Sequence, residues 1–133
     1  MATYAQVVIA VNEIAETQDY VMTAAGGLPG ELNMNWLSKS VHSFDCEYGF
    51  SCMGYEISGA WGAALARRKG RVITLLGDGS YMMMNSEIAT SVMLGKKLIV
   101  VVLDNRGFGC IQRLQLACGI PRFNNLLDDC VPE

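Results

Sequence analysis

Two continuously apolar segments, RVITLL (71–76) and KLIVVVLD (97–104), constrain the fold of this chain most strongly. Neither alternates between apolar and polar residues, which is typical of strands buried on both faces of a parallel sheet. Between them, SYMMMNSEIATSVMLG (80–95) predicts a helix that ends at Gly95. A strand, a helix and a strand of these lengths predict a βαβ unit with a right-handed crossover. Both strands then end at the same edge of the sheet.

The rest of the chain predicts further elements of the same kind. The predicted elements are a helix over residues 3–17, a strand and glycine turn over 19–27, a loop or short helix over 28–40, a strand segment over 43–50 and a helix over 54–70. We therefore expect a single α/β domain over residues 1–133. It should be a three-layer parallel sheet with helices on both faces.

Composition argues against several classes of function. Hydrophobic residues make up 51% of the 133 residues, but no apolar run approaches the roughly 20 residues of a membrane span. The N-terminus lacks the features of a secretory signal, and a net charge of −3 argues against a nucleic-acid partner. Five cysteines without a C-x-x-C pair favour reduced thiols in a cytoplasmic protein. The single histidine, His42, excludes a metal site that needs two.

A carboxylate between two glycines follows the first of the two apolar strands. Gly77 and Gly79 carry no side chains, so a ligand can approach the backbone on either side of Asp78. The N–H groups around Gly79 and Ser80 lie at the start of the predicted helix, where backbone donors favour anions. Anion donors beside a carboxylate indicate a site in which a divalent cation bridges the two.

The second apolar strand ends on Asp104-Asn105, followed by Gly107. Asn105 offers an amide oxygen at the same sheet edge as Asp78, and Gly107 can turn its backbone carbonyl toward the same point. Mg²⁺ prefers such oxygen ligands together with phosphate oxygens. Each motif alone is also typical of an ordinary turn. At the ends of two neighbouring apolar strands, they predict one site for Mg²⁺ and a diphosphate.

The spacing of these motifs resembles the signature of thiamine diphosphate-dependent enzymes, in which an asparagine follows G-D-G by some 27 positions (here 105 − 78 = 27). The resemblance implies thiamine diphosphate and Mg²⁺ as cofactors. It implies that the metal is held by Asp78, the Asn105 side chain and the Gly107 carbonyl, and the diphosphate by Gly79 and Ser80, with Gly77 beside them. The family usually has asparagine where this chain has Asp104, which is not the ligand position.

Two upstream segments extend the resemblance. Met53 lies 25 positions before the metal aspartate (78 − 53 = 25), where the family carries a bulky apolar residue that supports the bent cofactor. Alternatively, Met53 is a residue of the hydrophobic core. Gly26 and Gly27, in the loop after the first strand, are expected to approach the cofactor as well.

Longer sequence segments resemble one group of enzymes within the family. AAGGLPGEL, EYGFSCMGYEISGA and GDGSYMMMN resemble the C–C bond hydrolases of myo-inositol catabolism. This implies a small cyclic 1,2-diketone as substrate. Two alternatives remain open, which are another thiamine diphosphate enzyme of the acetolactate synthase type and a non-catalytic α/β interaction module.

The resemblance also implies that the chain is a fragment of a longer enzyme. Family members are several times longer, and their diphosphate-binding domain continues with a further strand and helix. The glutamate that activates the cofactor comes from a pyrimidine-binding domain, usually of a partner subunit. We therefore expect a homo-oligomeric parent, no catalytic residue in this chain and no turnover by the chain alone. Glu47, Glu56 and Glu87 qualify by residue type only, and surface or capping roles are expected for them.

Overall fold

The computed structural model describes residues 2–127. The elements in chain order are α1 (Tyr4–Ile14), β1 (Tyr20–Thr23), α2 (Leu28–Asn35), β2 (Phe44–Cys46), α3 (Tyr55–Ala66), β3 (Val72–Gly77), α4 (Asp78–Met84), α5 (Ser86–Met93), β4 (Ile99–Leu103) and α6 (Gly109–Ala117). Within residues 2–127, no helix has the length and apolar character needed to cross a membrane.

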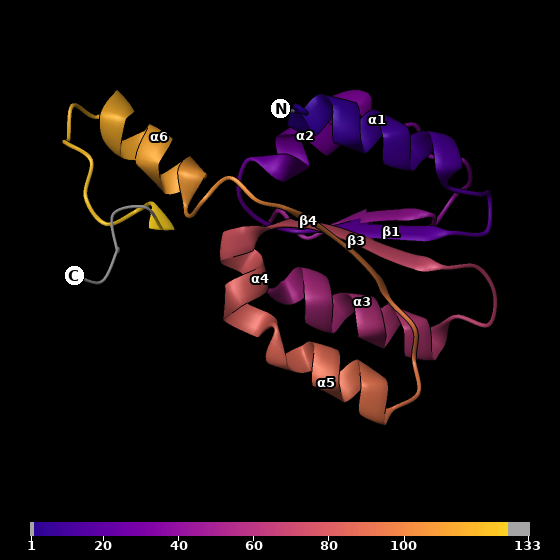
Figure 1. Ribbon diagram of the computed structural model, residues 1–133. Coiled ribbons are helices and arrows are strands. Elements are labelled where there is room, and N and C mark those ends of the chain that lie inside the picture. The colour runs from indigo at the N-terminus through magenta and orange to yellow at the C-terminus, as the bar shows by residue number, and fades with distance from the viewer. Residues whose placement is uncertain (1, 128–133) are drawn as a thin grey trace.

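The four strands form one sheet in the order β2-β1-β3-β4, and all three neighbouring pairs are parallel. Helices α1 and α2 lie on one face of this sheet, and α3, α4 and α5 lie on the other (Figure 1). This arrangement confirms the predicted three-layer α/β fold. In the β3–β4 pair Gly77 is level with Leu103, so the segments that follow the two strands begin at the same sheet edge.

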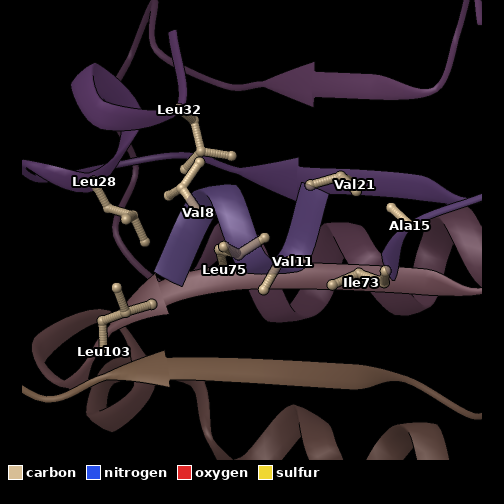
Figure 2. Packing of buried hydrophobic residues seen from close by; sticks show 9 residues of the cluster. All are labelled: Val8, Val11, Ala15, Val21, Leu28, Leu32, Ile73, Leu75 and Leu103. Atoms are coloured by element: carbon tan, nitrogen blue, oxygen red, sulfur yellow. The ribbon is translucent and has the colours of Figure 1, made fainter. Parts of the chain in front are cut away.

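The main core lies between the sheet and the α1–α2 layer (Figure 2). Its buried members are Val8, Val11, Ala15, Val21, Leu28, Leu32, Ile73, Leu75 and Leu103. A smaller cluster of Met22, Ala60 and Val72 lies on the α3 side. Strand β3 supplies Ile73 and Leu75 to the first cluster and Val72 to the second. Both faces of this strand are therefore buried, which explains why its sequence is apolar apart from Thr74, whose hydroxyl donates to backbone carbonyls, and the terminal Gly77.

The single helix predicted over residues 80–95 is two helices in the structure. Helix α4 begins at Asp78, and α5 begins at Ser86 after a break at Asn85. The Asn85 carbonyl accepts a hydrogen bond from the N–H of Ile88, three residues on, as in a turn of 3₁₀ helix. Asparagine is a poor residue for a helix interior because its side chain competes for backbone hydrogen bonds.

Helix α6 was not predicted. It lies beyond the edge of the sheet at which β3 and β4 end (Figure 1), and none of its residues is buried. Its apolar residues Cys110, Ile111, Leu114 and Ala117 recur at helical spacing, a pattern that the sequence analysis missed. The first helix is also shorter than expected, since it ends at Ile14 and not near residue 17.

Candidate functional site

A cleft of about 340 Å³ opens at the edge of the sheet where the strands end. Its walls come from the loops after β1, β2 and β4, from the junction of β3 and α4, from the first turns of α6 and from Tyr4 of α1. Eight residues predicted for the site line it, namely Gly26, Gly27, Met53, Gly77, Gly79, Ser80, Asn105 and Gly107. The structure thus brings together residues that are up to 81 positions apart (107 − 26 = 81).

Asp78 lies behind this wall and is only 7% exposed. It is the first residue of α4, directly after β3. Its Oδ2 accepts a hydrogen bond from the N–H of Gly107 (2.6 Å), and its Oδ1 accepts from the N–H of Asn105 (3.4 Å). The loop after β4 is therefore folded around the carboxylate that follows β3.

Three oxygen atoms converge beside the cleft when the Asn105 amide nitrogen faces Tyr4. The Asn105 Oδ1 position then lies 2.7 Å from the Gly107 carbonyl oxygen and 3.1 Å from Asp78 Oδ1. Neighbouring ligands of an octahedral Mg²⁺ are about 3.0 Å apart when each lies about 2.1 Å from the metal. Within residues 2–127 no three His, Cys, Asp or Glu side chains form a metal-binding cluster. The chemistry of this oxygen set fits a hard cation such as Mg²⁺.

The backbone beside Asp78 fits an anionic ligand. Gly79 and Ser80 are in the first turn of α4, where backbone N–H groups lack partners within the helix, and both residues line the cleft. A Cβ atom on Gly79 would lie 2.9 Å from the Phe108 ring and 3.2 Å from Met53 Cε. The absence of a side chain at Gly79 therefore keeps this part of the cleft open, and Met53 reaches across it.

Tyr4 is a site residue that the sequence analysis missed. Its hydroxyl lies 2.6 Å from the side-chain amide of Asn105, 101 positions away in the chain. Burial raises the pKa of Tyr4, the hydrogen bond with Asn105 lowers it and the negative charge of Asp78 raises it, leaving it above its ordinary value. The phenol is therefore neutral near pH 7. Tyr4 belongs to the apolar spacing of the first helix, and no local signal distinguishes it from a packing residue.

None of the three glutamates considered as cofactor activators lines the cleft. Glu47 accepts hydrogen bonds from the N–H groups of Phe50 and Cys52, and Glu87 accepts one from the Trp61 indole. Glu56 is fully buried, so the expected surface role is wrong for this residue. A capping role holds for Glu56, which accepts from the N–H of Gly54 at the start of α3.

Comparison with known proteins gives the family. Residues 25–128 match the family model described as "Thiamine pyrophosphate enzyme, C-terminal TPP binding domain". The chain belongs to this family, and the predicted cofactor, thiamine diphosphate, is thereby confirmed.

The chain is also similar to individual curated proteins. The chain is 43% identical over 113 residues to a 3D-(3,5/4)-trihydroxycyclohexane-1,2-dione hydrolase of Geobacillus thermodenitrificans, covering 85% of this chain and 18% of that protein. Proteins of the same name from Clostridium tetani and Bacillus thuringiensis are 43% identical over 121 residues, which is 91% of this chain and 19% of each relative. The chain therefore spans less than a fifth of the length of these relatives.

Proposed function

We propose that this chain binds Mg²⁺ and thiamine diphosphate together at the cleft, as the diphosphate-binding domain of a longer enzyme. The observation that carries the proposal is the convergence of the Asn105 side-chain amide on the Gly107 carbonyl oxygen and Asp78 Oδ1, at 2.7 and 3.1 Å, beside backbone donors at the start of α4. A single carboxylate with two neutral oxygens leaves positions for diphosphate oxygens, which is the usual way Mg²⁺ is held with a phosphate ligand.

Each predicted residue has a role in this proposal. Asp78, Asn105 and Gly107 hold the metal, and Gly77, Gly79 and Ser80 let the diphosphate approach the backbone. Met53 supports the cofactor above Gly79, and the loop at Gly26 and Gly27 borders the cleft on its other side. Thiamine diphosphate supplies the carbon nucleophile and electron sink for breaking a bond next to a carbonyl, and the protein supplies binding and orientation.

The parent enzyme is proposed to hydrolyse a C–C bond of a cyclic 1,2-diketone in inositol degradation. This rests on 43% identity to relatives named trihydroxycyclohexane-1,2-dione hydrolase. The three glutamates named above have structural hydrogen bonds outside the cleft, so we place the activating glutamate on a pyrimidine-binding domain beyond this chain. The chain alone is then inactive, and its parent is a homo-oligomer. Four free cysteines among the described residues favour a cytoplasmic protein.

The experiment that tests the site is calorimetric titration of the chain with thiamine diphosphate, with and without Mg²⁺. We expect binding that depends on Mg²⁺ and is abolished in Asp78→Ala, because that variant removes the only charged ligand of the set. Asp45→Ala is the matched control, since it removes a carboxylate from β2 that lies outside the cleft. Equal affinity in wild type and Asp78→Ala would refute the proposed metal site.

The proposed substrate is tested separately on the full-length parent protein. We expect consumption of trihydroxycyclohexane-1,2-dione, and no acetolactate formation from pyruvate. The reverse result would assign the parent to the acetolactate synthase type while leaving the cofactor site intact.

A further inference from the structure

We propose that Tyr4 of α1 is a positioning residue that orients the Asn105 amide, and so sets which of its atoms faces the metal. The inference rests on the proposed Mg²⁺ site and extends it to a residue outside the G-D-G and Asp-Asn motifs. It follows from the surroundings of one side-chain amide.

The Asn105 amide has chemically different neighbours on its two sides. One side faces the Tyr4 hydroxyl at 2.6 Å. The other faces two acceptors, the Gly107 carbonyl oxygen at 2.7 Å and Asp78 Oδ1 at 3.1 Å. A primary amide presents a donor on one side and an acceptor on the other, so only two orientations are available to it.

The two orientations suit two different states of the site. With its nitrogen toward Gly107 and Asp78, the amide donates to both acceptors, and its oxygen accepts from the Tyr4 hydroxyl. This orientation satisfies every group without a cation. With its oxygen toward Gly107 and Asp78, three oxygens face one another, an arrangement that only a cation makes favourable. The amide nitrogen then donates to Tyr4.

A tyrosine hydroxyl serves both orientations because it can either donate or accept. In the orientation with the amide oxygen toward the metal position, Tyr4 would accept from the amide nitrogen, and its own hydroxyl proton could be donated into the cleft that it lines. Phenylalanine at this position would keep the ring packed against the main core but would leave the amide nitrogen without an acceptor in the metal-binding orientation. Outer partners that orient metal ligands in this way typically change metal affinity by about 10–100-fold.

The test is a calorimetric titration of the whole chain with Mg²⁺ at saturating thiamine diphosphate. We expect Tyr4→Phe to weaken Mg²⁺ binding by about 10-fold or more. Tyr55→Phe is the matched control, since its hydroxyl lies outside the cleft and has no hydrogen-bond partner within residues 2–127. We expect this control to bind Mg²⁺ as the wild type does.

A double-mutant cycle separates orientation from a general structural effect. Asn105→Asp replaces the amide by a symmetric carboxylate, which presents an oxygen to the metal in either orientation. In the Asn105→Asp variant, we expect Tyr4→Phe to lower the Mg²⁺ affinity by less than about 3-fold. A loss of the same size in both backgrounds, or no loss in either, overturns the positioning role and leaves the metal site standing. A wild-type chain without Mg²⁺-dependent binding overturns both.

Discussion

Glu56 is an acidic residue whose side chain lies in the interior of the domain. Its carboxylate is fully buried, and a buried charge is unfavourable unless hydrogen bonds replace its hydration. Oε1 accepts from the N–H of Ala25 at 3.1 Å, and Oε2 accepts from the N–H of Gly54 at 2.8 Å. Ala25 and Met53, the neighbour of Gly54, both line the cleft. One carboxylate thus ties together two separate segments of the cleft wall.

Replacing Glu56 by glutamine is expected to destabilise the chain by about 1–3 kcal/mol. The amide has one acceptor oxygen, so its NH₂ group would face one of the two backbone N–H groups and leave it unpaired. Glu87→Gln is the matched control, because its remaining oxygen can still accept from the Trp61 indole at 3.0 Å. Urea denaturation of both variants provides the measurement. Equal effects from the two substitutions would contradict the proposed role of Glu56.

At the scale of elements, the loop after β4 is held by a segment far along the chain. The N–H of Phe108 donates to the Asn125 carbonyl at 2.7 Å, and the N–H of Leu127 donates to the Arg106 carbonyl at 2.8 Å. Between them, Gly107 forms an antiparallel bridge with Leu126. This pairing fixes the direction of the Gly107 carbonyl, the oxygen proposed to bind Mg²⁺.

We expect Gly107→Ala to lower the free energy of unfolding by more than about 1 kcal/mol and to weaken Mg²⁺-dependent cofactor binding. Gly107 has a φ of +135°, and an added Cβ would collide with the backbone carbonyl of Asn125. In contrast, Gly62 lies inside α3 without a positive φ, and among the described residues nothing lies within 4 Å of an added Cβ.

Gly62→Ala should therefore stabilise the chain by up to about 1 kcal/mol, through the higher helix propensity of alanine. Thermal unfolding measures the stability of the Gly107→Ala and Gly62→Ala chains, and calorimetry measures their Mg²⁺-dependent cofactor binding. A Gly107→Ala chain with wild-type stability and wild-type binding would show that the backbone pairing does not constrain the loop.

On the scale of the whole molecule, the two edges of the sheet differ in chemistry. The cleft lies where the strands end, whereas an ion pair between the buried Asp19 and the exposed Arg71 lies where β1 and β3 begin. Asp19, 3% exposed, accepts from Arg71 Nε at 3.0 Å and from the N–H groups of Arg71 and Glu16, each at 2.8 Å. Arg71 also donates to the carbonyl of Ile14, which connects the end of α1 to the start of β3.

The ion pair gives the stability of the chain a defined dependence on pH. Burial raises the pKa of Asp19, but the hydrogen bonds from the Arg71 side chain and from the Glu16 and Arg71 backbones outweigh it and lower the pKa from 3.8 to about 2. Because the folded pKa is below the unfolded one, this stabilisation is complete above about pH 4. It is lost as the pH falls toward about 2.

Asp19→Asn should therefore be less stable than the wild type by up to about 2 kcal/mol near neutral pH. The difference should decrease by about half near pH 3, where the wild-type carboxylate has lost part of its advantage. Urea denaturation of both proteins at the two pH values gives the measurement. An unchanged difference would mean that Asp19 acts through packing and not through its charge.

The sequence predicts those parts of the fold in which burial produces a local apolar pattern. Strand β3 is covered on both faces and is apolar apart from Thr74 and the terminal Gly77, whereas β4 is an edge strand in which only Leu103 is buried and Val102 is 40% exposed, so the predicted full burial of β4 is wrong. The parallel pairing of the two strands follows from the helix-length connection. The meeting of Asp78 and Asn105 follows from that pairing alone. The contact of Tyr4 with Asn105 depends on how α1 packs across the sheet, which no local pattern encodes. Helix α6 buries no residue, but Cys110, Leu114 and Ala117 lie at helical spacing, so its sequence did carry a signal that could have predicted it.

The carbonyl of Gly107 is a part of the proposed site that no particular side chain encodes. Single mutations replace side chains, whereas the position of this carbonyl oxygen depends on the path of the main chain. That path depends on pairing with residues 125–127, and the intervening residues 115–123 contribute nothing to the buried core. Among homologues, insertions and sequence drift should therefore accumulate in residues 115–123, while both paired segments keep their length.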